Sequence, residues 1–436
     1  MTPFGTKICA VAIGTVLEYY DFAVFGSLVD VIGELFFPNT SKIYSLLASL
    51  SVFGSAFLMR PLGGLFLGII GDTLGRQRAL EISIMLMLLP SFFIGCLPPY
   101  EVAGIGATIA LVVLRLLQGL AVGGEMVGAF VFTVESTGGD SPGYWGSLMK
   151  STSLVGNALG LGIATVLRHV LSEEAFRSWG WRLPFFLGLG LAFVGLYLRK
   201  QIVTDDAESK AGGGAETAGE DHSFSCSGLL SQWRELLLIS AVVATWAVGY
   251  YTCFVWLVYF NSVLMYGGEQ VVENAWWINL GMTVVLIFLF PMGGALGDRL
   301  SAWSGVGSGT ADPFNTNGFR LAMLAGAGLL VACSVPAFYL VAQREFWSVC
   351  AGQMLFAVAL ALYGGNMPVY LVYKFPPAAR YTGVGLGYNI ANAVFASSAA
   401  VVQTTLSMGD DVSDSKGLYP SLYLSAIAFF SFVTLL

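Results

Sequence analysis

Four ionisable side chains lie in strongly apolar parts of the chain, where a charge is costly: Glu18, Asp21, Arg60 and Arg115. Glu18 and Asp21 are three residues apart, so they share one face of a helix. Burial favours the neutral form of a carboxylic acid, whereas a nearby guanidinium group favours the carboxylate. An acid between these influences can exchange a proton when the arginine moves away, while the arginine stays charged. These residue types indicate proton transfer at a buried carboxylate.

The segments that must position these charges are long and apolar. The sequence has 436 residues, of which 56% are hydrophobic and 11% are charged, whereas a soluble domain is about a quarter charged. A membrane-spanning helix needs about 20 mostly apolar residues. We predict an all-α polytopic membrane protein with twelve transmembrane helices. The predicted spans are 8–28, 46–70, 79–97, 107–135, 147–171, 183–200, 236–263, 276–296, 321–342, 346–373, 381–406 and 418–436.

The distribution of Lys and Arg residues predicts the orientation. An even number of spans puts both termini on one side, and that side receives twice as many basic residues as the other. Because cytoplasmic loops carry the excess of Lys and Arg, we expect cytoplasmic termini and a multi-pass protein of the cell (inner) membrane. The basic residues assigned to the cytoplasmic side are Lys7, Arg76, Arg78, Lys150, Arg199, Lys200, Lys210, Arg234, Arg299, Arg320, Lys374 and Arg380.

The predicted depths of the four charges nearly coincide. At about 1.5 Å per residue, Asp21 lies roughly 20 Å along its span from the cytoplasm, and Arg115 roughly 12 Å along its span from outside. Arg60 is halfway along the second span, so two acids and two arginines can neutralise each other. Alternatively, these pairs only hold helices together, and the sequence leaves open whether Glu18 or Asp21 titrates. Glu125, in the cytoplasmic third of the fourth span, is a second candidate proton site or the fixed partner of a loop arginine.

A polar segment divides the chain into two halves. Residues 201–235 contain DDAESKAGGGAETAGEDHSFSCSG, which is acidic, rich in Gly and too poor in apolar residues to fold alone. We expect a flexible cytoplasmic linker between two six-helix bundles, residues 1–200 and 236–436.

The two halves carry similar loops after their second helix. The first reads GIIGDTLGRQR from Gly68, and the second reads GALGDRLS from Gly294. Repeated halves are typical of transporters whose two bundles rock around a central site.

Charged residues near these loops are candidates for gating. We predict that Asp72, Arg76 and Glu135 form an ion-pair cluster that closes the cytoplasmic end and opens when the carrier turns inward. Asp298 and Arg299 are the corresponding candidates in the second loop, although that loop lacks the basic ending of the first. The alternative is a set of exposed ion pairs, each worth under about 1 kcal/mol.

Several stretches resemble the major facilitator superfamily and its branch of metabolite–proton symporters, which includes carriers for proline and betaine, 2-oxoglutarate, citrate and shikimate. The stretches are GIIGDTLGRQR, EYYDF, RPLGG, RLLQGLAVGGE, WGWRLPFF and ARYTGVGLGYNI. The resemblance implies alternating access, import of a small organic solute with protons, and coupling by charges in the region of Asp21 and Arg115. We expect a monomer without a cofactor, whose partners are the solute, protons and the lipid bilayer.

Aromatic residues of the second half suggest how a solute binds. Trp246, Tyr250 and Phe254 follow one another at i, i+4 spacing, and aromatic faces attract quaternary ammonium groups. Arg60 and Arg115 could bind the carboxylate of a betaine-like solute, or both carboxylates of a dicarboxylate. For most of these aromatic residues the alternative is packing or an interface belt. The predicted substrate-binding residues are Tyr19, Phe22, Arg60, Arg115, Trp246, Tyr250, Tyr363 and Asn389.

Other classes of function fit the sequence less well. A net charge of −7 argues against nucleic acid as a partner. The six cysteines have no metal-ligand or disulfide spacing, and we find no nucleophile with its base and no HExxH motif, which argues against an enzyme. An uncoupled facilitator or exchanger of an organic acid is the alternative function, but it would not require titratable acids beside arginines.

Overall fold

The computed structural model describes residues 3–38, 41–74, 76–137, 140–191, 193, 232–264, 272, 274–304, 316–376, 380–408 and 418–436. All elements assigned within these ranges are helices. The predicted linker, apart from residues 232–235, and the end of the sixth predicted span lie outside the described residues.

Twelve helical segments of the described part follow the predicted spans in order. Nine helices are long and apolar enough to cross a membrane, and a bent pair near the N-terminus makes a tenth span. A shorter apolar helix, Met85–Cys96, lies at the third predicted span, and residues 183–191 form a helix at the sixth. The predicted all-α polytopic fold is confirmed.

The first half contains six spans, several of them interrupted. Its elements are α1 (Pro3–Ser27), α2 (Val29–Phe36), α3 (Lys42–Leu58), α4 (Arg60–Leu74), α5 (Arg76–Cys96), α6 (Tyr100–Ala103), α7 (Ile105–Ala121), α8 (Glu125–Ser136), α9 (Pro142–Val170), α10 (Glu173–Ser178), η1 (Gly180–Arg182) and the helix at 183–191.

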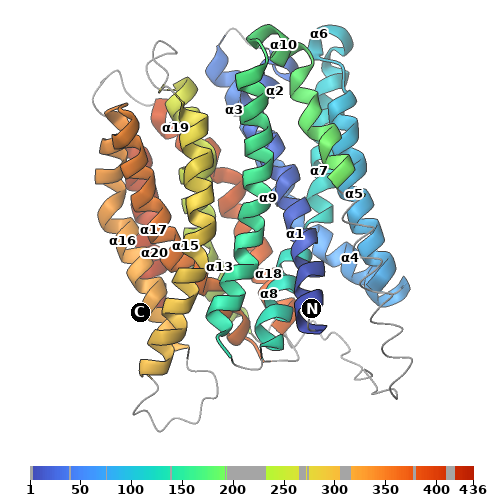
Figure 1. The fold of residues 1–436 in the computed structure, drawn as a ribbon. Helices are drawn as coiled ribbons and strands as arrows, with labels where there is room; N and C mark the ends of the chain where they lie inside the picture. The colour runs from blue at the N-terminus through green and yellow to red at the C-terminus, as the bar shows by residue number, and fades with distance from the viewer. Residues whose placement is uncertain are drawn as a thin grey trace.

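The second half contains the other six spans. Its elements are α13 (Trp233–Tyr250), η2 (Tyr251–Trp256), α14 (Leu257–Tyr259), η3 (Phe260–Leu264), α15 (Ala275–Ser304), α16 (Asn317–Ala342), α17 (Phe346–Tyr373), α18 (Arg380–Ala391), η6 (Asn392–Ala396), α19 (Ser397–Met408) and α20 (Leu418–Leu435). The long helices of both halves run side by side, and both chain ends lie in the lower part of the view (Figure 1).

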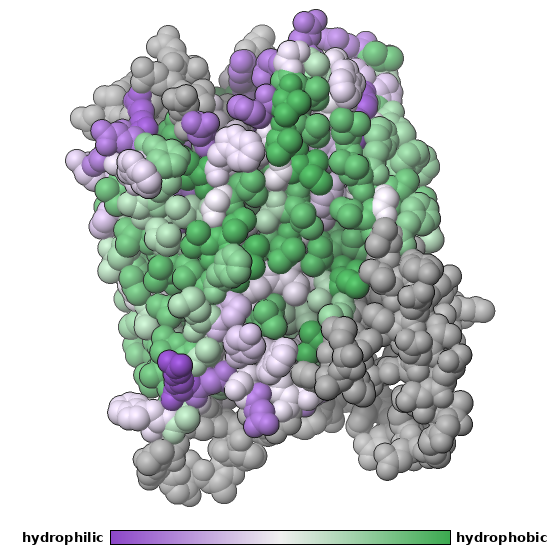
Figure 2. All heavy atoms as spheres, in the orientation of Figure 1, coloured by the Kyte–Doolittle hydropathy of each residue, from purple (hydrophilic) through white to green (hydrophobic). Residues whose placement is uncertain are grey.

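The surface has the polarity of a membrane protein. Figure 2 shows a broad band of apolar side chains around the middle of one face, with polar side chains toward the two ends. Large apolar side chains such as Phe288, Met292 and Tyr339 are more than half exposed. Such a surface is stable against lipid tails rather than water.

Four of the spans are interrupted by bends, breaks or π-helical turns. α1 and α2 meet at a 59° bend, which follows Gly26-Ser27, a dipeptide type common at kinks. The fourth span is broken between α7 and α8, and the seventh and eleventh contain the π-helical segments η2, η3 and η6. Breaks of this kind free backbone groups and often occur at functional sites.

The two halves approach each other at glycines. α9 and α15 pack along one another between the halves (Figure 1), where a β-carbon on Gly143 would meet the carbonyl oxygen of Gly294. At the contact of α3 with α19, a β-carbon on Gly54 would meet the carbonyl oxygen of Ser397. Small residues permit such close helix approach.

One basic residue lies elsewhere than predicted. Lys150 was assigned to the cytoplasmic side, close to a helix start at residue 147, but α9 begins at Pro142 and the Lys150 side chain is 1% exposed. Proline at the first position of a helix is favourable, so the helix begins earlier than the apolar run. Lys150 is therefore a buried residue, more than two turns inside the helix.

Replacing Gly54 with Ala tests the contact between the halves. The added methyl group has no space beside Ser397, and overpacking costs about 1–3 kcal/mol. We expect a lower midpoint of thermal unfolding for the purified protein in detergent. The matched control is Gly281→Ala in α15, where a β-carbon would have no neighbour within 4 Å. Equal midpoints for Gly54→Ala and the wild type would contradict the packing.

Candidate functional site

A buried ion pair joins the first two spans. Arg60 Nη2 lies 3.4 Å from Glu18 Oε1, and both side chains are 1% exposed. The guanidinium group also faces the rings of Phe22, at 5.2 Å, and Phe57, at 4.7 Å. Because a lone charge is costly at this depth, the pair holds α1 against α4.

Asp21 is held by two neutral side chains. Ser91 of α5 donates a hydrogen bond to Oδ1, and Gln118 of α7 donates to Oδ2 at 2.5 Å. The amide oxygen of Gln118 in turn accepts a 2.9 Å hydrogen bond from Arg115. Arg115 therefore acts on Asp21 through Gln118, and the predicted charge pair contains an intervening amide.

The four predicted charges lie in one layer. The guanidinium carbons of Arg60 and Arg115 are both 5.2 Å from the centre of the Phe22 ring. Arg115 is fully buried, faces Phe25 at 4.0 Å and donates to the carbonyl oxygen of Phe53 at 3.4 Å. The four charges therefore lie close together, as a common depth requires, whereas their depth in a membrane and their roles stay predictions.

A fifth charge, Lys150, lies close to this layer. Its ammonium group donates to the hydroxyl of Tyr388 at 3.3 Å and lies 4.2 Å from the centre of the Trp246 ring. It is near enough to interact electrostatically with Arg60 and Glu18. The sequence signal that could have identified Lys150 as a buried residue is Pro142, which favours a helix start before the apolar run.

An aromatic column leads from Lys150 to a cavity. The ring of Trp246 stacks on Tyr250, with centroids 5.2 Å apart, and Tyr250 stacks on Phe254 at 5.6 Å. This confirms the predicted column on the seventh span. Its far end lines a cavity with Phe22 and Asn157. The free volume of about 30 Å³ suffices for a few waters only, so the cavity is too small for a solute in this conformation.

The lower closure consists of contacts between the halves near the chain ends. Glu135 of α8 forms a 2.6 Å ion pair with Arg380 of α18. Asp298 of α15 accepts hydrogen bonds from the backbone N–H groups of Gly143 and Tyr144, each at 2.8 Å. Because Ser141 provides no side-chain cap for α9, Asp298 of the other half satisfies its free N–H groups.

Asn389 also belongs to the lower closure. It was predicted to bind substrate, and its amide nitrogen donates to the carbonyl oxygen of Gly123. Gly123 lies at the break between α7 and α8, where carbonyl groups lose their helical donors. In this conformation, Asn389 therefore connects the two halves.

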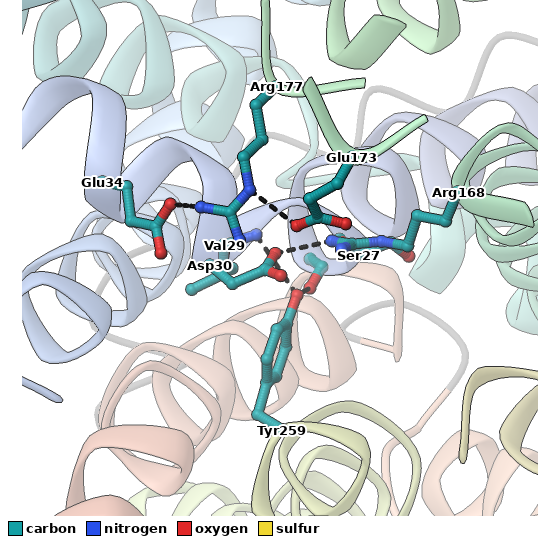
Figure 3. A network of polar contacts seen from close by, with 9 residues as sticks. Ser27, Val29, Asp30, Glu34, Arg168, Glu173, Arg177 and Tyr259 are labelled. Atoms are coloured by element: carbon teal, nitrogen blue, oxygen red, sulfur yellow. Dashed lines mark hydrogen bonds and ion pairs between the residues drawn. The ribbon is translucent and has the colours of Figure 1, made fainter. Parts of the chain in front are cut away.

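The upper closure lies at the opposite end and surrounds the bend between α1 and α2 (Figure 3). The hydroxyl of Tyr259 donates to the carbonyl oxygen of Gly26 and accepts from the N–H group of Val29 at 3.2 Å. Arg168 lies 2.6 Å from Asp30. Because contacts between the halves are present at both ends of the described bundle, we infer an occluded conformation.

Arg177 extends the upper closure within the first half. It forms ion pairs with Glu34 and with Glu173, the latter at 2.6 Å (Figure 3). Glu173 is exposed and Glu34 is partly exposed, so these pairs contribute little to stability. Glu173 belongs to α10 itself, so only the pair with Glu34 connects α10 to α2.

Of the remaining predicted residues, Tyr19 lies close to the charge layer, beside Glu18 and Arg60. Tyr19 is buried beside Tyr388, whereas the buried Tyr363 donates its hydroxyl to the carbonyl oxygen of Val242. Glu125 is the first residue of α8 and is partly exposed. Arg299 is exposed. The side chains of Asp72 and Arg76 lie outside the described residues.

Replacing Glu18 with Gln tests the buried pair. The substitution leaves the charge of Arg60 without its partner, and breaking a buried pair in this way costs about 3–5 kcal/mol. We expect a clearly lower midpoint of thermal unfolding, partly restored in the double variant Glu18→Gln/Arg60→Gln. The control, Glu101→Gln on the exposed α6, should leave the midpoint unchanged. A wild-type midpoint for Glu18→Gln would show that the pair is not needed for stability.

Replacing Tyr259 with Phe tests the upper closure. The change leaves two backbone groups without their partner, at a cost of about 1–3 kcal/mol, so the ratio of closed to open molecules should fall about 5-fold or more. If the upper end faces outside, as the distribution of basic residues predicts, a single cysteine at the cavity position Asn157 should react faster with an impermeant thiol reagent outside intact cells, in a background without other cysteines. Tyr339→Phe, on an exposed tyrosine of α16, is the control. An unchanged rate for Tyr259→Phe would refute the closure.

The known proteins that are similar to this chain are transporters. Residues 7–202 match a family model described as "Sugar (and other) transporter". A proline/betaine transporter of Escherichia coli K12 is 31% identical over 433 residues, which cover 98% of this chain and 82% of that protein. An alpha-ketoglutarate permease of the same strain is 30% identical over 394 residues, covering 90% of this chain and 85% of the permease.

Solved structures share the fold. The crystal structure of a D-xylose–proton symporter has a TM-score of 0.70 at 15% identity, and the match covers 98% of this chain and 96% of that chain. A partially occluded, inward-open conformation of the E. coli xylose transporter XylE has a TM-score of 0.66, also at 15% identity, covering 99% and 97%. The chain belongs to the major facilitator superfamily and is a multi-pass secondary transporter of small metabolites, related to the proline/betaine transporters.

Proposed function

We propose that the protein imports a small organic solute together with protons by alternating access. The solute is a zwitterion such as proline or betaine, or a small carboxylate, as the names of the relatives suggest. The observation that carries the proposal is the buried Asp21, which lies between neutral hydrogen-bond donors and within the influence of Arg115.

Asp21 is the better proton site of the two acids. Glu18 contacts the guanidinium group of Arg60 directly, and a buried arginine strongly favours the charged carboxylate. The direct donors to Asp21 are Ser91 and Gln118, which carry no charge. A serine hydroxyl can accept a hydrogen bond as well as donate one, so Ser91 can accommodate a protonated Asp21 without repacking.

Solute binding involves the space between the charge layer and the upper closure. The cavity there is lined by Phe22, Tyr250 and Tyr251, together with the amides of Asn157 and Asn279. Aromatic faces suit the cationic part of a zwitterion, and the neighbouring positive charges suit its carboxylate. This arrangement also fits an organic acid, and only transport measurements separate the two.

Alternating access follows from two closures that open in turn. The halves, residues 1–200 and 236–436 joined by the linker 201–235, would rock about the site. Release of the lower closure, which we assign to the cytoplasmic side, discharges solute and proton into the cell, and release of the upper closure admits them. We infer a monomer in the cell (inner) membrane, with cytoplasmic termini.

Replacing Asp21 with Asn tests proton coupling. Purified protein in proteoliposomes would be given labelled proline, betaine, 2-oxoglutarate, citrate or shikimate, each with and without an inward proton gradient. For the wild type we expect accumulation of one compound that depends on the gradient. In Asp21→Asn, accumulation should fall by at least about 10-fold, because the amide cannot carry a proton, while solute exchange at equal pH persists.

The matched control is Asp140→Asn, on an exposed residue, which should accumulate solute like the wild type. Transport that depends on neither the proton gradient nor Asp21 would refute proton coupling. It would instead support the alternative function, an uncoupled facilitator or exchanger of an organic acid.

A further inference from the structure

Lys150 lies at the interface of the two halves, among side chains from both. Its ammonium group faces Trp246 of α13 at 4.2 Å, Phe130 of α8 at 5.3 Å and Tyr388 of α18 at 5.5 Å. The Tyr388 hydroxyl, at 3.3 Å, is its hydrogen-bond partner. A lysine among aromatic rings is a cation–π arrangement, so aromatic faces and one hydroxyl group hold the ammonium in this conformation.

The charges around Lys150 do not balance. Among the residues that the structure describes, the buried layer contains three basic side chains, Arg60, Arg115 and Lys150, but two acidic ones, Glu18 and Asp21. Glu18 is already paired with Arg60, and Asp21 is linked to Arg115 through Gln118. A buried charge without a counter-charge is unfavourable, so the layer accommodates one further negative group.

The route from the cavity to Lys150 follows the aromatic column. Tyr250 lines the cavity. In the column it lies between Phe254 and Trp246, and Trp246 is the ring closest to Lys150. A solute in an enlarged cavity thus meets aromatic faces first and the ammonium group behind them. Lysine has a flexible four-carbon stem, so the ammonium can turn from the ring toward the solute.

We propose that Lys150 is a specificity-determining residue that binds the carboxylate of the transported solute. This inference rests on the proposed function, in which the solute carries a carboxylate. In the occluded carrier without solute, the ammonium occupies the face of Trp246. When the solute enters, its carboxylate pairs with Lys150, and a cationic group of a zwitterion can take the vacated ring.

The test compares glycine betaine with choline, a quaternary ammonium compound without a carboxylate. Exchange of labelled proline, glycine betaine or 2-oxoglutarate across proteoliposomes is measured without a proton gradient, and choline is added as a competitor. The variants are Lys150→Gln, Lys150→Arg and the control Lys374→Gln, which removes a lysine near Tyr370, 4.8 Å away, just after the end of α17. Lys150→Met repeats the comparison if the Gln variant does not fold.

For Lys150→Gln we expect the half-saturating concentration of the carboxylate solute to rise at least about 10-fold. Inhibition by choline should be unchanged or stronger, because the substitution removes from the Trp246 ring a positive charge that repels choline. Lys150→Arg should stay within about 3-fold of the wild type, since the charge is retained, and Lys374→Gln should match the wild type.

A general loss of structure would weaken the binding of glycine betaine and the binding of choline together, and that result would overturn the inference. So would an unchanged half-saturating concentration in Lys150→Gln. The exchange assay needs no proton gradient, so proton coupling can fail while the role of Lys150 stands. If the wild type exchanges none of the three, citrate and shikimate are measured in the same way, and a protein that exchanges none of the five carboxylates would refute both the solute class and the inference.

Discussion

The cost of a charge inside a membrane protein constrains the whole arrangement described above. Glu18 and Arg60 can stay buried because each neutralises the other across 3.4 Å. Asp21 is compensated through a chain of hydrogen bonds that passes from Ser91 and Gln118 to Arg115. These partners come from α1, α4, α5 and α7, so the requirement to satisfy buried charge determines how the first four spans pack. Our two proposals, a proton at Asp21 and a solute carboxylate at Lys150, both concern charge added to this layer.

Both closures use one physical device. A helix in one half ends or breaks, its backbone groups lose their helical partners, and a side chain from the other half replaces them. Tyr259 does this at the α1–α2 bend, Asp298 at the start of α9, and Asn389 at the break before α8. Water in an opened vestibule can form the same hydrogen bonds. The closures therefore add specificity to the occluded state without making it too stable to leave, which a carrier requires.

Much of the fold could be predicted because each span can be recognised from its own local sequence. The order of the twelve helical segments, the closeness of the four charges and the stacking of Trp246, Tyr250 and Phe254 all follow from hydropathy and helical periodicity. Gln118 and Ser91 were not singled out, because a neutral polar residue in an apolar span is common and acquires a role only through its neighbour. Lys150 was assigned to a loop because α9 starts before its apolar run does.

The membrane class, the helices and the presence of costly buried charges can be read from the sequence, since they depend on the apolar content and spacing of neighbouring residues. Which partner satisfies each polar group depends on how the helices pack. Glu135, predicted to join Asp72 and Arg76, pairs with Arg380, a residue 245 positions away. Tyr259 completes a bend 233 positions earlier in the chain. Such pairings depend on how two halves dock, and the docking is the sum of many weak contacts that no local pattern records.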